Sequence, residues 1–178
     1  MEQIQTFRPN ETNQNEAGVV AKWTQESKWM LPKSEAEILG LFSRGWSILV
    51  KKVTDEEELV VAHAAITYEW GVYLELGAVV TEINHRKRGL ARIAVLGVLG
   101  MIRENFPEKR VMALCNDMSL PIFVGLGGQV ISGKELPGEV WSECEKCPKY
   151  KLAKERGQVC CDTPVDMTEV GIVRKNDL

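Results

Sequence analysis

Residues 84–100, NHRKRGLARIAVLGVLG, constrain the fold more than any other stretch of this chain. Three basic residues stand at positions 86–88, a glycine follows, and an almost unbroken apolar run begins. Apolar residues at helical spacing are Leu90, Ile93, Ala94, Val98, Met101 and Ile102, and Leu96 and Leu99 widen the stripe. A helix that is apolar around most of its circumference is normally buried. The sequence therefore predicts a long buried helix that begins directly after a basic turn.

The segments around this helix predict a sheet flanked by helices. Ser34 followed by Glu37 is a capping-box pattern and predicts a helix that Gly45 ends. Further helices are expected to begin at residue 12 or 13 and at 118 or 119. Strand composition marks residues 3–8, 46–53, 59–67, 72–81, 110–115 and 129–132. We expect an α/β (α+β) fold with a mixed, mainly antiparallel central sheet.

Charge and composition exclude several classes of protein. The 178 residues carry 22 Lys or Arg against 25 Asp or Glu, a formal net charge of -3, so we expect the basic cluster to form a local site and not a nucleic-acid coat. Residues 93–102 are too short to span a bilayer, and the first residues lack the apolar core of a signal peptide. We expect a cytoplasmic protein with no membrane partner, in which cysteines are thiols or metal ligands before disulfides.

Arg86, Gly89 and Ala91 form the pattern Arg-x-x-Gly-x-Ala where a strand passes into the buried helix. The first turn of a helix has unpaired N–H groups and attracts anions, glycine allows a phosphate to approach the backbone, and arginines add charge-assisted hydrogen bonds. A phosphorylated ligand would account for the basic residues, although the tripeptide pattern by itself is more typical of a turn exposed to solvent. A solvated basic turn ahead of a core helix is the alternative.

A second motif, NDMSLPIFVGLGG at residues 116–128, follows the next predicted strand. Together the two motifs resemble the GCN5-related N-acetyltransferase (GNAT) superfamily, whose signatures are Arg/Gln-x-x-Gly-x-Gly/Ala and Asn-x-x-Ser/Ala-x-x-Leu-Tyr-x-x-x-Gly-Phe. Asn116, Ser119, Ile122 and Gly127 fall on fixed positions of the second signature without a gap, whereas Phe123 and Gly128 replace its tyrosine and phenylalanine. The resemblance covers residues 3–135 and does not reach the cysteine-bearing tail.

The resemblance implies that acetyl-CoA, or a related acyl thioester, lies where strand 72–81 splays from strand 110–115. The pantetheine arm would follow the backbone of residues 79–81, the pyrophosphate would meet the N–H groups of residues 87–91, and Asn116 and Ser119 would contact the arm. The residues implied to bind acetyl-CoA are Val79, Val80, Thr81, Arg86, Lys87, Arg88, Gly89, Leu90, Ala91, Asn116, Ser119 and Phe123. Asn116 has a second interpretation, as a turn residue that caps the next helix.

Acetyl transfer to an amine needs a base, because a simple alkyl amine with a pKa of roughly 10 is protonated at neutral pH. Glu75 interrupts the apolar strand VYLELGAVV, and its place before Gly89 resembles that of the base in histone-type members of the superfamily. A solvated outward glutamate is the alternative, and Glu69 and Glu82 are further candidate bases. Strand alternation places Glu75 on the face opposite Leu74, Leu76 and Ala78.

The backbone N–H of Val80 is the expected donor to the oxyanion. Phe123 stands where the superfamily often has a tyrosine acid and cannot donate a proton, but a thiol with a pKa of about 8.5 leaves readily as the thiolate. Cys115 has no recognisable histidine partner and is interpreted as a buried strand cysteine. His63, within the apolar strand LVVAHAAIT, is interpreted as a hydrogen-bonded residue of the sheet.

From residue 137 onward, charged residues and four cysteines replace the periodic apolar spacing of the preceding segments. We expect an acetyltransferase domain at residues 1–136 and a Cys-rich appendage at 137–178. Cys144-x-x-Cys147 has zinc-knuckle spacing, and a structural zinc would take Cys144, Cys147, Cys160 and Cys161 as ligands. Free thiols or a disulfide formed on oxidation are the alternatives.

The predicted function is acyl-CoA-dependent N-acetyl transfer to a primary amine by direct attack. A non-catalytic acyl-CoA sensor and a zinc-stabilised nucleic-acid or protein-interaction adaptor are alternatives. The expected partners are acyl-CoA and an amine, nucleic acid is not expected, and the sequence leaves a homodimer open. Possible walls of the acceptor pocket are Trp23, Trp29, Trp46, Tyr68 and Trp70, for each of which core packing is the alternative.

Overall fold

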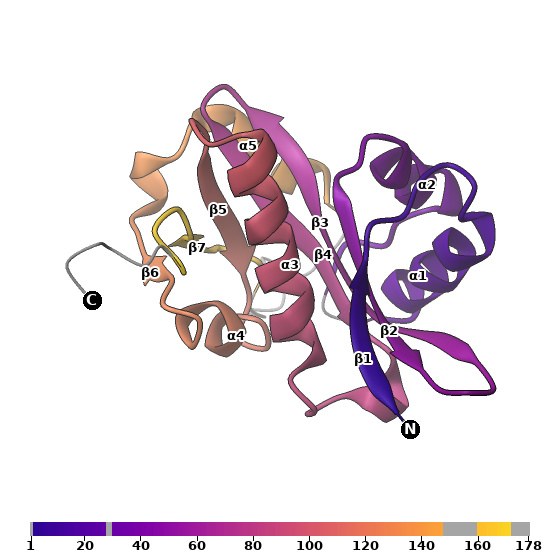
Figure 1. Cartoon of the computed structure of the whole chain (residues 1–178). Coiled ribbons are helices and arrows are strands. Elements are labelled where there is room, and N and C mark those ends of the chain that lie inside the picture. The colour runs from indigo at the N-terminus through magenta and orange to yellow at the C-terminus, as the bar shows by residue number, and fades with distance from the viewer. Residues whose placement is uncertain (1, 28–29, 148–159, 172–178) are drawn as a thin grey trace, which may run out of the picture.

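A seven-stranded sheet forms the centre of the protein (Figure 1). The computed structural model describes residues 2–27, 30–147 and 160–171. The elements are β1 (Gln3–Phe7), α1 (Gln14–Glu26), α2 (Glu35–Ser43), β2 (Ser47–Val53), β3 (Glu58–Trp70), β4 (Tyr73–Thr81), a 3-10 helix (Ile83–His85), α3 (Leu90–Asn105), β5 (Arg110–Cys115), α4 (Leu120–Val124), β6 (Gln129–Val130), a second 3-10 helix (Gly133–Glu135), α5 (Gly138–Lys146) and β7 (Thr163–Asp166).

The strand order is β1-β2-β3-β4-β5-β7-β6. Only the β4–β5 pair is parallel, and every other neighbouring pair of described strands is antiparallel. The predicted mixed, mainly antiparallel sheet is therefore confirmed. The sequence did not predict β7, which comes from the tail and lies between β5 and β6. The division of the chain at residue 136 stays a prediction, and the Cys-rich appendage is not confirmed.

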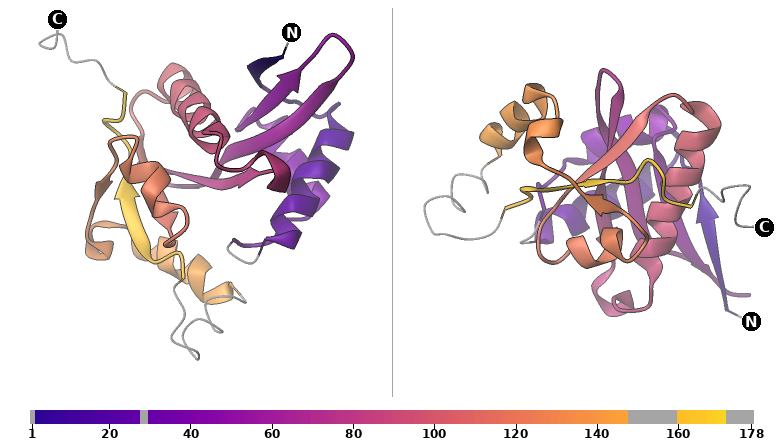
Figure 2. Two further views of the ribbon diagram at one scale, coloured as in Figure 1. Left: turned by 90° about the horizontal axis from the view of Figure 1, so that it is seen from below. Right: turned by 90° about the vertical axis from the view of Figure 1, so that its left-hand side faces the viewer.

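Helices cover both faces of the sheet, and the two views of Figure 2 show them on opposite sides. The predicted buried helix is α3, whose apolar side chains form the largest core cluster with one face of β2–β5. Helices α1 and α2 cover the other face over β2–β4 and form a second cluster. Val140 of α5 packs against Tyr73 and Met112 on that same face, farther along the sheet. No helix in the described ranges is long and apolar enough to cross a membrane.

Local sequence signals explain where several elements begin and end. The Ser34 hydroxyl accepts from the Glu37 N–H at 3.2 Å, and the Glu37 carboxylate accepts from the Ser34 N–H at 2.7 Å, so the predicted capping box is present. Gly45 adopts φ +67° just after α2, a conformation that glycine tolerates without steric cost. The capping box thus explains where α2 begins, and Gly45 explains how the chain turns from α2 into β2.

A β-bulge interrupts β4 at Ala78. The register moves from His63↔Val80 to Ala65↔Gly77, so two steps along β3 correspond to three along β4. Ala78 has φ +48°, which is unusual for a residue with a side chain. The predicted alternation is corrected here: Ala78 lies in the cluster of α1 and α2 and not with Leu74 and Leu76 under α3. The extra residue reverses the side-chain phase of the strand.

His63 holds this bulge from the neighbouring strand. Its Nδ1–H donates to the Ala78 carbonyl at 2.9 Å, and its Nε2 accepts from the Ser47 hydroxyl at 3.1 Å. Nδ1 must carry the proton because a carbonyl oxygen only accepts. Complete burial lowers the pKa of His63 to about 4, so the ring is neutral at physiological pH. The predicted structural role of His63 is confirmed.

Two glycines of α3 should respond in opposite ways to the same substitution. A Cβ at Gly97 would lie 2.9 Å from Cγ2 of Ile48, a stiff buried side chain, whereas a Cβ at Gly100 meets nothing within 4 Å. We expect Gly97→Ala to lower the free energy of unfolding by about 1–3 kcal/mol. Gly100→Ala should raise it by about 0.5–1 kcal/mol through helix propensity. Urea denaturation of both variants tests this, and equal effects would contradict the close packing of α3 on β2.

Protonation of His63 should destabilise the fold in acid. The unfolded chain takes up this proton near pH 6.5 and the folded chain only near 4, so stability falls as the pH drops through this window and the effect levels off below 4. Between pH 7.5 and pH 5, His63 should remove about 2 kcal/mol of unfolding free energy. His63→Gln should abolish that part of the loss in urea titrations. His85→Gln is the matched control and should retain it.

Candidate active site

Strands β4 and β5 separate part of the way along their length. They pair through Tyr73↔Arg110, Leu74↔Val111 and Glu75↔Met112 only, although β4 continues to Thr81. Beyond Glu75, the side of β4 that faces β5 has no strand partner among the described residues. The backbone of residues 77–81 can therefore bond a ligand there as a further strand would. This is the splay at which the resemblance places an acyl thioester.

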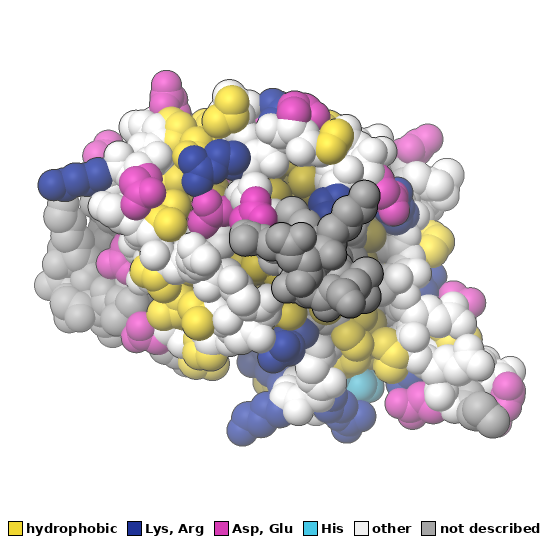
Figure 3. Space-filling model, turned by 60° about the vertical axis from the view of Figure 1, so that its left-hand side comes forward, with side chains coloured by type: hydrophobic (Ala, Val, Ile, Leu, Met, Phe, Trp, Pro, Cys, Tyr) yellow, Lys and Arg dark blue, Asp and Glu magenta, His cyan; other side chains and the backbone are white. Residues whose placement is uncertain are grey.

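The basic turn at residues 86–89 is exposed and leads directly into α3. Lys87 and Gly89 adopt φ +62° and +77°. The first helical bond runs from Ile93 N–H to the Gly89 carbonyl, and the N–H groups of Leu90, Ala91 and Arg92 donate to no other described residue. Figure 3 shows Lys and Arg side chains gathered at the lower edge of the molecule, where Figure 1 places this turn. Unpaired donors and positive charge thus coincide at the start of a 16-residue helix.

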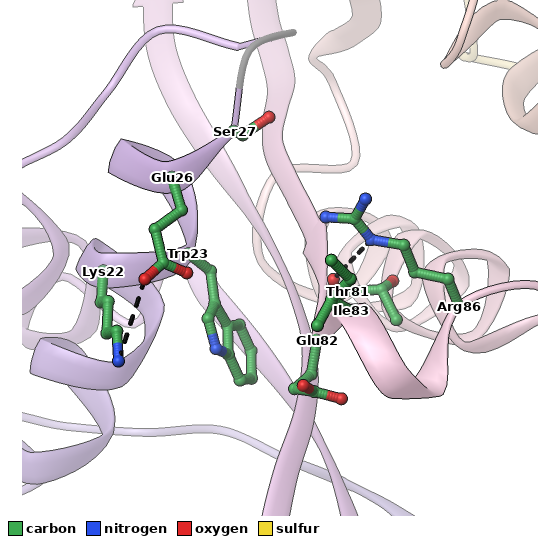
Figure 4. Close-up of a pocket in the computed structure, with 8 residues that line it drawn as sticks. All are labelled: Lys22, Trp23, Glu26, Ser27, Thr81, Glu82, Ile83 and Arg86. Atoms are coloured by element: carbon green, nitrogen blue, oxygen red, sulfur yellow. Dashed lines mark hydrogen bonds and ion pairs between the residues drawn. The ribbon is translucent and has the colours of Figure 1, made fainter.

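A pocket of about 440 Å³ lies beside this turn, between α1 and the end of β4 (Figure 4). Arg86 lies on one side of the pocket, where its Nε donates to the Thr81 carbonyl at 3.3 Å. The Trp23 ring of α1 lies on the other side and also packs against the core cluster of α1 and α2, and its role in an acceptor pocket stays a prediction. The lining residues are Lys22, Trp23, Glu26, Ser27, Thr81, Glu82, Ile83 and Arg86.

Glu75 lies at the last paired position before the strands separate. It is half-buried, and its Oε2 accepts from the Thr67 hydroxyl of β3 at 2.8 Å. Loss of hydration raises the pKa of Glu75, while the Thr67 hydrogen bond and the charge of Lys33 lower it by less. The carboxyl is thus neither a fully solvated surface group nor part of an ion pair with a described residue. Glu69, in contrast, is exposed and pairs with Lys109 at 2.6 Å.

Asn116 and Ser119 form the turn that leads from β5 into α4. Asn116 Oδ1 accepts from the N–H groups of Met118 and Ser119, both at 3.0 Å, so Asn116 is a turn residue as one interpretation had it, although the N-cap position of α4 is Ser119. Its Nδ2 donates to the Cys161 sulfur at 3.8 Å. Phe123 is buried in the main core cluster. The roles of Asn116, Ser119 and Phe123 toward a ligand stay predictions.

Two cysteines of the tail interact with residues of the candidate site, Cys161 with Asn116 and Cys144 with Glu75. Burial first, and then the charge of Glu75, raises the pKa of Cys144 to about 12, and burial together with the charge of Cys160 raises that of Cys161 to about 11. Burial also raises the pKa of Cys115 to about 12, as expected for an inert core thiol. No three His, Cys, Asp or Glu side chains in the described parts of the chain are arranged to hold a metal ion, so the predicted zinc site is not supported.

The sequence analysis missed Lys33, which precedes the capping box of α2. The residue is only 8% exposed, and its Nζ lies 5.7 Å from the centre of the Tyr68 ring. Tyr68 stacks on Trp70 with centroids 5.0 Å apart and is the register partner of Glu75. A lysine between Pro32 and Ser34 gives no periodic signal of burial, because it lies in a connection between two helices. Trp29 falls outside the described residues.

Comparisons with known proteins found similar folds among solved structures. No family model and no curated protein matches the sequence. Among solved structures, Rv2747 from Mycobacterium tuberculosis in complex with CoA is 17% identical, with a TM-score of 0.62 over 84% of this chain and 86% of its own. Diaminobutyrate acetyltransferase EctA from Paenibacillus lautus is 11% identical, with a TM-score of 0.60 over 93% of this chain and 94% of the EctA chain.

A GCN5-related N-acetyltransferase from Kribbella flavida is 21% identical, with a TM-score of 0.52 over 72% of this chain. The match spans only 33% of the Kribbella chain. The parallel β4–β5 pair that splays at Glu75, the bulge in β4 and the basic turn before α3 all lie within residues 3–135, the range that the resemblance covers. The chain has the fold of the GCN5-related N-acetyltransferases.

Proposed function

We propose that this protein transfers an acetyl group from acetyl-CoA to a primary amine by direct attack of the amine on the thioester. The observation that carries the proposal is the unpaired edge of β4, which lies between a half-buried carboxyl at Glu75 and the exposed basic turn at residues 86–89. One end of this edge suits a diphosphate and the other suits an amine. The CoA bound to Rv2747 and the diaminobutyric acid bound to EctA support the same pair of substrates.

The basic turn suits the diphosphate of CoA. The N–H groups of residues 90–92 lack partners among the described residues, and a Cβ at Gly89 would meet nothing within 4 Å, so the space before the helix is open. Arg86, Lys87 and Arg88 are exposed and add positive charge. Backbone donors fix the phosphate position, while arginine side chains supply charge-assisted hydrogen bonds.

The unpaired edge of β4 suits the pantetheine arm, whose amides bond as a strand would. Val79, Val80 and Thr81 supply this backbone, and the turn at Asn116 and Ser119 lies where β5 ends. The bulge at Ala78 shifts the backbone of β4 just before these residues. The bound thioester supplies an activated acetyl group, and the protein orients it toward the half-buried Glu75.

Glu75 is the proposed base. A base that works near neutral pH needs a pKa above that of a solvated carboxyl, and loss of hydration raises the pKa of Glu75 in this direction. Its hydrogen bond from Thr67 fixes the carboxylate while leaving the second oxygen to accept the amine proton, directly or through water. The neutral amine then attacks the carbonyl carbon of the thioester.

The remaining steps need little from the protein. An N–H on the open side of β4, at Val79 or Thr81, is the proposed donor to the oxyanion, because Val80, the donor predicted from the sequence, pairs with His63 of β3. Phe123 is 2% exposed and has no proton to give, so the sulfur leaves as the thiolate, which its pKa of about 8.5 permits. A sensor that only binds acyl-CoA is the second candidate, favoured by Phe123. A thiol-release assay with a panel of amines separates the two, because a sensor would bind acetyl-CoA without releasing free thiol.

Replacement of Glu75 should remove the base and spare cofactor binding. We expect Glu75→Gln to lower kcat about 10²- to 10⁴-fold, with the KM for acetyl-CoA within about twofold of the parent value. Glu69→Gln is the matched control on the neighbouring strand and should keep its activity. A Glu75→Gln enzyme with unchanged kcat, or an inactive Glu69→Gln enzyme, would contradict this assignment.

The hydrogen bond from Thr67 should set the acid limb of the pH profile. Activity requires ionised Glu75, so it should fall as the pH drops through the raised pKa of that carboxyl. The Thr67 hydroxyl lowers this pKa, so Thr67→Val should move the acid limb of kcat toward higher pH. Initial rates of thiol release from pH 5 to 9 measure the limb. A shift toward lower pH would be inconsistent with Glu75 as the base.

The basic turn should matter only for substrates that carry the diphosphate. We expect Arg86→Gln/Arg88→Gln to raise the KM for acetyl-CoA by about tenfold or more, because charge-assisted hydrogen bonds to phosphate are lost. The KM for acetyl-pantetheine, which lacks the diphosphate, should not change. Arg44→Gln on α2 is the control for loss of a surface charge. Equal effects on both thioesters would place the diphosphate elsewhere.

A further inference from the structure

Lys33 is a buried cation on the face of the sheet that α1 and α2 cover. It lies in the connection between these helices and is 8% exposed. Its main chain is fixed from α1: the Lys33 N–H donates to Thr24 Oγ1 at 2.9 Å, and Gln25 Nε2 donates to the Lys33 carbonyl at 3.1 Å. The connection therefore holds this residue in a defined position before any ligand arrives.

The ammonium of Lys33 forms no ion pair in the parts of the chain that the structure describes. The carboxylates of Glu37 and Glu75 interact with it electrostatically but lie beyond ion-pairing distance, and the centre of the Tyr68 ring lies 5.7 Å from Nζ. A cation over an aromatic face gains some stabilisation. That gain is smaller than the cost of removing an ammonium from water, so a buried lysine normally has an anionic partner.

Lys33 also lies close enough to Glu75 to act on it electrostatically. The positive charge of Lys33 lowers the pKa of Glu75, although no ion pair joins the two groups. Tyr68, under the Lys33 ammonium, is the register partner of Glu75 across β3 and β4. The proposed base and a cation that forms no ion pair with a described residue thus lie on one side of the same two strands, and both lie near Tyr68.

We propose that the acceptor is an amine that also carries a carboxylate, and that Lys33 binds this carboxylate while the amine faces Glu75. The proposal rests on the proposed acetyl transfer and names its acceptor class. A single ammonium matches the single charge of a carboxylate, whereas a phosphate dianion is usually held by several donors. Lys33 is therefore a specificity-determining residue, which binds the acceptor away from the reacting atoms.

The test uses pairs of amines that differ only in the carboxylate. The full chain is assayed by thiol release at saturating acetyl-CoA with β-alanine, 4-aminobutyrate and α-amino acids against ethylamine, propylamine and the matching decarboxylated amines. We expect the parent enzyme to favour the carboxylate-bearing member of at least one pair by about tenfold or more in kcat/KM. Lys33→Met should remove this preference, with the larger part of the change in KM and a smaller part in kcat, and Lys33→Arg should retain part of the preference.

Lys134→Met, which removes an exposed lysine from the 3-10 helix Gly133–Glu135, controls for a change in net charge and should leave the preference intact. Thermal unfolding of each variant checks that the fold survives. No preference in the parent enzyme for any carboxylate-bearing amine, or a preference that persists in Lys33→Met, would overturn the proposal.

Calorimetric binding of the same panel in the presence of CoA separates this proposal from the proposed catalysis. If no amine is acetylated, acetyl transfer fails as the function, and Lys33 is judged by binding alone. Carboxylate-bearing amines that bind the parent protein and lose about tenfold or more in affinity with Lys33→Met would still support Lys33 as their binding residue. Equal binding to both proteins, or no binding to the parent, would overturn it.

Discussion

The short pairing between β4 and β5 is the constraint on which the site depends. Three residue pairs join the two strands, and beyond Glu75↔Met112 the strands no longer pair with each other. A sheet normally satisfies its backbone groups strand by strand, so an interior strand with an unpaired edge leaves donors and acceptors for a ligand. The bulge at Ala78, which His63 secures, lies just beyond the point of separation. The hydrogen bonds of a buried histidine thereby help to fix the shape of the candidate site.

The packing of α3 explains why the basic turn lies beside this edge. The helix buries Leu90, Ala94 and Val98 against the sheet, and its first residue is already in the core. Because the apolar stripe extends to the very start of the helix, the preceding turn is held directly at the end of β4. Burial of α3 therefore fixes the position of an exposed, highly charged segment that has few contacts of its own.

Much of the fold followed from patterns that act over short distances. The capping box at Ser34, the apolar period of α3 and the two motifs at residues 86–91 and 116–127 each depend on neighbouring residues, and each predicted an element that the structure contains. Pairing between strands that are distant in the sequence left no comparable local pattern. β7 is four residues, TPVD, with a proline and no alternation, and only its place between β5 and β6 makes it a strand.

The parts of the site that the sequence analysis missed depend on tertiary contacts. The bulge in β4 reversed the faces predicted by alternation, because a single extra residue is invisible in a strand of mixed apolar residues. Lys33 is buried by the helices that precede and follow it, whereas lysine residues are usually exposed, so nothing in the sequence indicated its burial. The tail cysteines suggested a metal from their spacing alone, whereas the described side chains are not arranged to hold one, and partial burial raises the pKa values of Cys144 and Cys161.

Glu75 and Lys33 together suggest how acceptor binding and base strength are related. Loss of hydration raises the pKa of Glu75 and the charge of Lys33 opposes that rise, so the free protein holds the carboxyl closer to its ordinary value than burial alone would. A carboxylate bound at Lys33 would offset the opposing charge. The pKa of Glu75 would then rise, and the carboxylate would accept a proton more readily when an acceptor is present than when the site is empty. An amine without a carboxylate would lack this effect as well as the ion pair, so its disadvantage would extend from binding to the chemical step.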